Sequence, residues 1–391
     1  MKRFWYLSQL IFFLFPYSIH AADNVVNIYA WANEIPDFVV RLFEKETHIK
    51  VNISTYENNE IMYTKLRTTK KNAAYDIVMP SSYFVDRMRH HDMLEKLDKT
   101  KIPHWKNLNS QFLNPTYDPD SSYSVPFIWG VTGIFYNSNY FPNNSASAAV
   151  PTIPGFQERA SSPRRSIPSM VATSFKPGMV GTAAEANNSI KKWNDLWDER
   201  FYNKLMLLDD TREIFSMGLL ALGYSPNDSN PEHIKAAFLK LKELMQNVKV
   251  FSSDTVVSII IDEDATVGMS WNGDAYKAFQ DNKNIKFVFP EEGFVIWVDT
   301  FAIPKNAPHK EAAYAFINFM LRDDIGKEVA LYTTFPSANA AAQKLLPAEI
   351  SQNPIIYPTQ DILKHGHFQT DLSDETLALF EKYWEELKMS G

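Results

Sequence analysis

The hydrophobic positions in the first third of the chain alternate between two patterns. Residues 25–30, 51–55 and 75–79 are short runs rich in β-branched and aromatic residues, which predicts three strands. After each strand, apolar residues recur at helical spacing. One predicted helix begins at Pro36, and two further helices are predicted over residues 59–69 and 82–93. Strands and helices in turn predict an α/β fold with a mostly parallel, helix-covered sheet.

A second α/β region begins near residue 205. Its predicted strands are 205–208, 266–270, 285–289 and 295–303. Its predicted helices are 211–222, 231–248, 310–321, 325–333 and 374–388. The two regions predict two similar α/β lobes with a cleft between them. Ligands of such sheets bind beyond the carboxyl ends of the strands, where Trp31 and Ser81 are predicted to lie.

Two segments fall outside this alternation. Residues 1–22 combine Lys2 and Arg3 with a short apolar run and a final Ala21-Ala22 pair, which predicts a cleaved signal peptide. The apolar run is shorter than the roughly 20 residues that a membrane span needs, so we expect an exported, soluble protein. Residues 142–189 are rich in Ser, Ala, Pro and Asn without an apolar period. We interpret them as a disordered surface insertion.

Composition narrows the classes of function. The chain has 391 residues, of which 45% are hydrophobic and 14% aromatic, and a net charge of −7, which argues against a nucleic acid as partner. The absence of Cys excludes disulfides, thiolate metal sites and a lipid-modified Cys. The nine His are scattered, and neither a phosphate-binding Gly-rich loop nor a Ser nucleophile elbow occurs. We therefore expect no catalytic residue, no metal and no cofactor.

Asp210 and Glu213 are the first candidate site residues. They follow a predicted strand and are three residues apart, a spacing that places both carboxylates on one face of a helix. The same spacing at a helix start is typical of a capping box, in which both side chains bond backbone N–H groups. If Asp209 were the cap instead, the other two acids would be free for a ligand.

Aromatic residues near predicted strands supply the second kind of candidate. Trp297 and Asp299 are two residues apart in a strand, so they share one of its faces. Trp271 follows another predicted strand, and Trp31 and Tyr83 occupy comparable positions. Each ring can line a ligand cleft or cover a hydrophobic core, and both interpretations stay open.

Together these acids and rings describe an acidic aromatic box, which suits a polyamine. Aromatic faces attract cations by about 0.5–2 kcal/mol each. Charge-assisted hydrogen bonds contribute roughly 1.5–3 kcal/mol each. Rings would cover the methylene chain while separate carboxylates hold its ammonium groups. Glycoside hydrolases also place paired carboxylates in aromatic clefts, so a secreted hydrolase using Asp210 and Glu213 is a rival hypothesis.

Six stretches of the chain match the motifs of one family in the same order. They are residues 54–60, 75–81, 123–130, 208–213, 269–273 and 297–299. In these stretches the chain resembles the periplasmic spermidine/putrescine-binding proteins of polyamine ABC importers, and the resemblance covers nearly all of the mature chain except residues 142–189. It implies a two-lobe, type II periplasmic binding protein fold, with two connecting strands and the polyamine clamped between the lobes.

The resemblance also implies roles for individual residues. The implied contacts are aromatic walls at Trp31, Tyr83, Trp271 and Trp297, amine-binding carboxylates at Asp210, Glu213 and Asp299, and polar contacts at Ser81, Ser253 and Gln369. The chain departs from the family pattern in two places. After Trp31 the family usually has Thr or Ser, an acid and Tyr, whereas this chain has Ala32-Asn33-Glu34; Phe335 replaces a further Tyr. Glu34 and Phe335 join the candidate ligand contacts.

The sequence thus predicts the periplasmic substrate-binding component of a polyamine import system. We expect it to bind spermidine or putrescine, to be a monomer without enzymatic activity, and to dock on the importer's inner-membrane permease subunits. The expected lobes are residues 23–133 with about 300–345, and residues 134–299 with about 346–391. The rivals are the hydrolase and a binding protein of the same fold for another solute, which the altered run at 32–34 favours.

Overall fold

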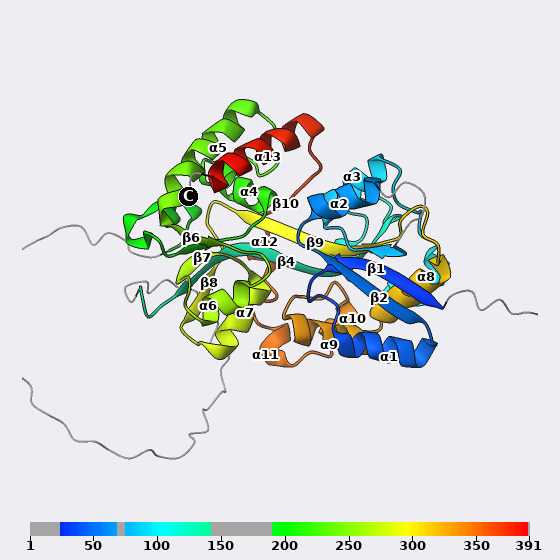
Figure 1. Cartoon of the computed structure of the whole chain (residues 1–391). Coiled ribbons are helices and arrows are strands. Elements are labelled where there is room, and N and C mark those ends of the chain that lie inside the picture. The colour runs from blue at the N-terminus through cyan, green and yellow to red at the C-terminus, as the bar shows by residue number, and fades with distance from the viewer. Residues whose placement is uncertain (1–23, 69–74, 142–189, 390–391) are drawn as a thin grey trace, which may run out of the picture.

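A computed structural model describes residues 24–68, 75–141 and 190–389. The predicted signal peptide and the insertion at 142–189 therefore lie outside the described residues. Within them, ten strands form one sheet in the order β2-β1-β3-β9-β4-β7-β5-β6, with β10 added to β9 and β8 to β4 (Figure 1). The strands are β1 (Val25–Trp31), β2 (Lys50–Tyr56), β3 (Ile77–Val78), β4 (Ser124–Asn137), β5 (Leu205–Leu207), β6 (Val248–Phe251), β7 (Val267–Trp271), β8 (Ile285–Val288), β9 (Phe294–Ala302) and β10 (Gly366–Phe368).

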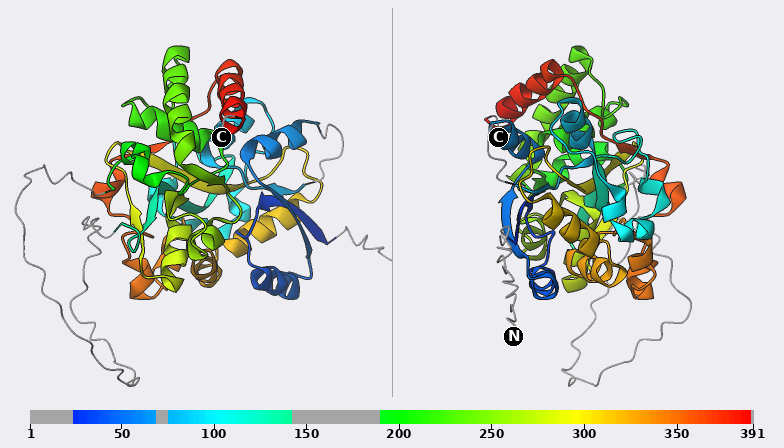
Figure 2. Two further views of the ribbon diagram at one scale, coloured as in Figure 1. Left: turned by 60° about the vertical axis from the view of Figure 1, so that its left-hand side comes forward. Right: turned by 90° about the vertical axis from the view of Figure 1, so that its right-hand side faces the viewer.

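Helices cover both faces of this sheet. They are α1 (Asp37–Thr47), α2 (Asn59–Thr68), α3 (Ser82–His90), α4 (Thr211–Ala221), α5 (Pro231–Leu244), α6 (Val256–Ile261), α7 (Asn272–Asp281), α8 (Lys310–Met320), α9 (Asp323–Thr333), α10 (Ala340–Gln343), α11 (Ala348–Ser351), α12 (Gln360–Leu363) and α13 (Asp374–Lys388). In Figure 1, α2, α3, α5 and α13 lie above the sheet, and α1, α7, α9 and α11 lie below it. Helices α5 and α13 stand side by side (Figure 2), where Phe238 and Tyr383 stack at 4.5 Å.

The sheet has two parallel flanks and an antiparallel centre. On one flank β1 pairs in parallel with β2 and β3, and on the other β5 pairs in parallel with β6 and β7. The centre is formed by β4 and β9, which pair antiparallel with each other. The expectation of mostly parallel sheets therefore holds for the flanks, whereas the long central strands run in opposite directions.

Two large hydrophobic cores lie at the two ends of the sheet. One core joins β1, α1, α8 and α9, and Phe43 packs there against Phe316 and Phe319. The other joins β5, α4, α5 and α13, and Phe215 stacks on Phe380 there. We call these ends the first and the second lobe. Strands β4 and β9 contribute side chains to both cores, so they connect the two lobes.

Most predicted elements occur within a few residues of their expected bounds, and α13 has the bounds predicted for it. The helix predicted over 231–248 is wrong at its end, because α5 stops at Leu244 and residues 248–251 form strand β6. Parallel pairing of β6 with β5 replaces the helical hydrogen bonds there. The sequence interpretation also lacked β4, whose fourteen residues are all buried and show no period-two alternation.

Candidate ligand-binding site

A cavity of about 500 Å³ lies between the two lobes, a size typical of small-ligand sites. It opens beyond the carboxyl ends of β1, β3, β5, β6 and β7, as the sequence pattern predicted. All twelve predicted site residues line it: Trp31, Glu34, Ser81, Tyr83, Asp210, Glu213, Ser253, Trp271, Trp297, Asp299, Phe335 and Gln369. The fold therefore brings together every residue that the sequence had selected.

Asp210 and Glu213 lie at the start of α4 and form one end of the cavity. Asp210 is the N-cap of this helix, and its Oδ1 accepts a hydrogen bond of 2.9 Å from the backbone N–H of Glu213. The suggestion that Asp209 is the cap is therefore wrong. The Glu213 side chain does not complete a capping box; its Oε1 accepts a bond of 3.0 Å from Thr132 on β4, and Oε2 has no hydrogen-bond partner among the described residues.

Asp299 lies on β9 opposite the end of β3 and is tied into a network of buried side chains. The hydroxyl of Ser81 donates to its Oδ1 at 2.6 Å. The amide of Asn59, at the start of α2, donates in turn to the Ser81 hydroxyl at 3.0 Å and to the Tyr83 hydroxyl at 3.1 Å. This network fixes the Asp299 carboxylate against the first lobe and leaves its other side toward the cavity.

Glu34 is carried by the loop that follows β1. Its side chain is buried, with 8% of the residue exposed, and its Oε2 has no hydrogen-bond partner among the described residues. Burial raises its pKa well above the usual range, and the charge of Asp299 raises it further. Two neighbouring carboxyl groups cannot both ionise in such a site. Protonated Glu34 therefore donates a hydrogen bond to Asp299.

Aromatic rings form the walls between these acids. Trp297 lies against Trp271 at a centroid distance of 6.3 Å and against Phe335 at 5.1 Å. Two glycines allow this packing. A Cβ atom at Gly130 on β4 would lie 2.3 Å from the Trp297 ring, and one at Gly273 would lie 2.3 Å from the Phe335 ring. Larger residues at either position would push the walls into the cavity.

The alternative that the rings serve the core is partly right as well. Tyr83 is 5% exposed and Trp297 is 8% exposed, and both belong to hydrophobic clusters. The Arg212 guanidinium lies 5.0 Å from the Tyr83 ring centroid, so one face of this ring is occupied by the protein itself. Trp271 and Trp31 are more exposed and present more ring surface to the cavity.

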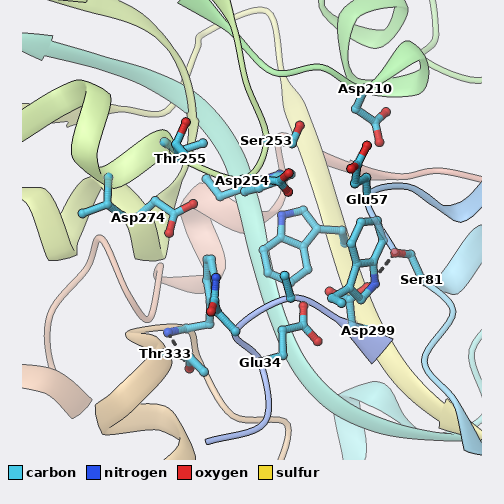
Figure 3. Close-up of a pocket in the computed structure, with 18 of the residues that line it drawn as sticks. Glu34, Glu57, Ser81, Asp210, Ser253, Asp254, Thr255, Asp274, Asp299 and Thr333 are labelled. Atoms are coloured by element: carbon cyan, nitrogen blue, oxygen red, sulfur yellow. Dashed lines mark hydrogen bonds between the residues drawn. The ribbon is translucent and has the colours of Figure 1, made fainter. Parts of the chain in front are cut away.

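Several residues that line the cavity were missed by sequence reasoning. They include Tyr56, Glu57, Asn59, Asp254, Asp274, Lys277, Tyr332 and Thr333. Figure 3 shows Asp274 and Asp210 on opposite sides of the cavity, with Glu34 and Asp299 lower in the view. Asp274 directly follows the Trp271-Asn272-Gly273 stretch, and its place three residues after a candidate ring at a predicted strand end was a signal that could have found it.

The cavity is strongly acidic. Its carboxyl groups belong to Glu34, Glu57, Asp210, Glu213, Asp254, Asp274 and Asp299, whereas Lys277 is the one basic residue that the structure places along its lining. Burial raises the pKa of Glu213 to about 8 and those of Asp274 and Asp299 to about 7. Near neutral pH these buried acids are therefore only partly ionised, and a cation bound beside them would favour their charged forms.

Metal-binding geometry, membrane-spanning helices and the lining of the cavity can each be compared with the described residues. Among the described residues, no group of three or more His, Asp or Glu side chains has the geometry to hold a metal. None of the helices in that part of the chain has the length and apolar character to cross a membrane. Indole faces and separated carboxyl groups can hold apolar and cationic parts of one ligand at the same time.

Comparison with known proteins gives a consistent result. The family described as "Bacterial extracellular solute-binding protein" matches residues 39–359. A spermidine/putrescine-binding periplasmic protein of Salmonella typhimurium is 39% identical over 94% of this chain and 93% of its own length. The resemblance that the sequence motifs indicated is thus confirmed.

Solved structures share the fold as well. A protein from Listeria monocytogenes aligns with a TM-score of 0.80 and 31% identity over 94% of this chain and all of its own. The spermidine/putrescine ABC transporter substrate-binding protein PotD from Streptococcus pneumoniae aligns with a TM-score of 0.69 and 29% identity over 94% and 99%. Both the two-lobe fold and the sequence therefore show that this chain belongs to the family of bacterial extracellular solute-binding proteins.

Proposed function

We propose that this chain captures a linear polyamine, spermidine or putrescine, in the cleft between its lobes. The observation that carries the proposal is the excess of buried carboxyl groups in a cavity walled by indole rings. Ammonium groups would replace the protons that these acids hold, and the rings would cover the methylenes between them. The ligand names of relatives that match 94% of the chain support the same ligand class.

The proposal assigns a role to each residue that the sequence selected. Asp210 and Glu213 would hold one ammonium group at the second lobe, and Asp299 with Ser81 would hold another at the first lobe. Trp31, Tyr83, Trp271, Trp297 and Phe335 would line the alkyl chain, while Ser253, Gln369 and Glu34 would contribute polar contacts. The Ser253 hydroxyl is buried without a hydrogen-bond partner among the described residues, so it could form a hydrogen bond with a bound ligand.

Capture would involve closure of the two lobes about the strands that join them. Strands β4 and β9 serve both cores, so a bend in them would move one lobe against the other. The proposed lobes are residues 23–133 with about 300–345, and residues 134–299 with about 346–391. The closed protein, a monomer exported through its signal peptide, would deliver the polyamine to the permease subunits of an ABC importer. It would have no catalytic activity of its own.

Titration calorimetry of the ligand-free, mature protein tests this proposal. Putrescine and spermidine should each bind with a dissociation constant of micromolar order or tighter, about −8 kcal/mol or more favourable. Neutral sugars and amino acids, measured at the same concentrations, should give no binding heat. Absence of binding by either amine, or saturable binding of a sugar, would overturn the proposal. Release of chromophore from chromogenic glycosides would instead support the hydrolase.

A further inference from the structure

A short segment, residues 370–374, joins the lining of the cavity to helix α13 and is bound by an arginine from each lobe. Arg212 on α4 belongs to the second lobe, and its Nη1 donates a hydrogen bond of 3.2 Å to the backbone oxygen of Thr370. Arg87 on α3 reaches the same segment from the first lobe, where α3 shares a hydrophobic cluster with residues of β1, β2 and β3. The two lobes therefore meet at this segment.

Arg87 makes three polar contacts with the second lobe. Its Nη1 donates to Oδ1 of Asp371 at 3.1 Å and to the backbone oxygen of Leu372 at 3.2 Å. Its Nη2 donates to the carboxylate of Asp374. The guanidinium carbon also lies 5.0 Å from the centroid of the Tyr63 ring on α2, so the first lobe supports the same group. We call Arg87, Asp371 and Asp374 the interlobe clasp.

The positions of these charges favour the contact. Arg87 is 7% exposed, and the side chains of Asp371 and Asp374 are 22% and 67% exposed. Arg87 lies in the last turn of α3 and Asp374 in the first turn of α13, where helix ends attract a cation and an anion respectively. A buried guanidinium is costly without its acceptors. Movement of the lobes apart would take three acceptors from Arg87.

The clasp lies beside the cavity without being part of it. Its three residues are not among the described residues that line the cavity, but close neighbours of two of them are. Tyr83 lies one helical turn before Arg87, and Gln369 lies two residues before Asp371. Gln369 is fixed to the second lobe, because its Nε2 donates to the Ser216 hydroxyl on α4 at 3.1 Å. The clasp thus holds cavity walls of different lobes next to each other.

We propose that the interlobe clasp stabilises the lobe arrangement in which the site residues face one cavity, and thereby strengthens ligand binding without touching the ligand. Its members are positioning residues, and the inference rests on the proposed capture of polyamines. An ionic contact suits lobes that must separate again, because water solvates the charged groups once they part. Loss of the clasp would lower the fraction of binding-competent protein, and this reduces the apparent affinity for every ligand by the same factor.

Calorimetry of Arg87→Met with spermidine and putrescine tests the clasp. Met removes the guanidinium and keeps an unbranched side chain that can pack on Tyr63. Both amines should bind about tenfold more weakly, and by the same factor, because charge-assisted hydrogen bonds between the lobes are lost. Arg87→Lys retains the charge and should recover part of the affinity. Arg89→Met is the matched control on the same helix and should change neither affinity, because Arg89 bonds Asp86 and Tyr117 of the first lobe.

The acids of the clasp provide a second, independent test. The double variant Asp371→Asn with Asp374→Asn should weaken both amines about as much as Arg87→Met does. Adding Arg87→Met to this variant should cause little further loss, because both changes remove the same contacts. Glu375→Gln is the control for the acids, since Glu375 is exposed in the same first turn of α13 and should not affect binding.

The outcomes separate this inference from the proposed function. If the wild type binds neither amine, the proposed function fails and the clasp fails with it. If both amines bind but Arg87→Met and the acid variant leave their affinities unchanged, or weaken one amine much more than the other, the clasp is refuted while polyamine binding stands. An equal loss in Arg89→Met would also refute it. Thermal unfolding shows that each variant is folded, and the acid variant decides the question if Arg87→Met is not.

Discussion

The two ends of the cleft hold their carboxyl groups by different means. At the second-lobe end, Asp210 and Glu213 share the first turn of one helix, and a backbone N–H bonds Asp210. At the first-lobe end, Glu34 and Asp299 come from a loop and a strand far apart in the chain; Asp299 raises the pKa of Glu34, whereas the hydrogen bond from Glu34 lowers the pKa of Asp299. Local geometry thus sets one end, whereas only the folded protein creates the other.

This difference has an electrostatic consequence. The helix start offers Asp210 N–H donors that favour its charged form and oppose the effect of burial on its pKa. Glu34 has no such donor, and its proton satisfies Asp299 instead. Before a ligand binds, a proton would stabilise the first-lobe end, and the helix start would in part stabilise the second-lobe end. An ammonium ligand replaces the proton in the first case and supplements the helix in the second.

The largest expected effect is a fall in the stability of the ligand-free protein as pH rises from 5 to 9. Carboxyl groups with folded-state pKa values of about 7 and 8 keep protons that the unfolded chain, with pKa values near 4, has already released. Stability is thus complete below the unfolded-state pKa values near 4, falls as pH rises above them, and levels off once pH exceeds the folded-state values of about 7 and 8. Each unit of pKa shift is worth about 1.4 kcal/mol, so the total amounts to several kcal/mol.

Urea unfolding at a series of pH values measures this fall, and two variants divide it between the ends. Glu213→Gln should remove the part of the decrease that continues up to about pH 8, and Asp299→Asn should remove the part that ends at about pH 7. Saturating spermidine should reduce the pH dependence in the wild type, because bound ammonium groups offset the ionised carboxylates. A stability that stays level or increases between pH 6 and 8 would contradict the assignment of raised pKa values to both ends.

The second expected effect distinguishes the ends by their affinity for amines. Asp299→Asn should weaken binding of both putrescine and spermidine by about a hundredfold, because an ammonium group would be left in the cleft without its charge partner. Asp210→Asn should weaken binding only about tenfold. Asn is as good an N-cap as Asp, so the helix start is preserved, and Glu213 remains to hold the ligand.

Calorimetry at one pH and ionic strength measures both losses, with Asp209→Asn as the control. Asp209 is exposed next to Asp210 and lies 3.4 Å from Lys388, outside the residues that line the cavity. An equal loss for Asp210→Asn and Asp299→Asn would show that the two ends contribute equally to amine binding. The proposed difference between an end stabilised by the helix start and an end stabilised by a proton would then be wrong.

The same contrast explains how much of the site could be predicted. Asp210 and Glu213 could be found because their spacing and the preceding strand are both local features of the sequence. The choice between cap and ligand contact could not be made, because one residue does both: Asp210 caps α4 and still lines the cavity. Asp274 was missed because its local signal, a position three residues after Trp271 at a predicted strand end, is also that of any acid in the first turn of a helix.

The fold shows the same limit. The flanking strands and helices follow the alternation of hydrophobic patterns, so most of them were predicted. Strand β4 was not, because all of its residues are buried between helical layers and its sequence has no alternation to recognise. Its role depends on pairing with β9 and β7 in space. Strand β4, which joins the lobes and places Thr132 within hydrogen-bond distance of Glu213, is thus defined by long-range contacts.

The smallest expected effect concerns Lys277, the basic residue among those that line the cleft. The charge of Lys277 lowers the pKa of Asp274 and so opposes the raising effect of burial. The same charge would repel an amine ligand. The Nζ atom of Lys277 also lies 5.6 Å from the centroid of the Tyr332 ring. Lys277→Met keeps an unbranched side chain that can pack on this ring and removes the repulsion. Because Lys277 is exposed and salt screens it over about 10 Å, spermidine affinity should rise only about two- to threefold, and only at low ionic strength.

Lys283→Met, an exposed change just beyond α7, should have no effect in the same titration. A loss of affinity in Lys277→Met would mean that the contact of Lys277 with Tyr332 on α9 favours ligand binding more than the repulsion between Lys277 and the amine opposes it. The first-lobe end would then be stabilised in part by a cation of the protein itself.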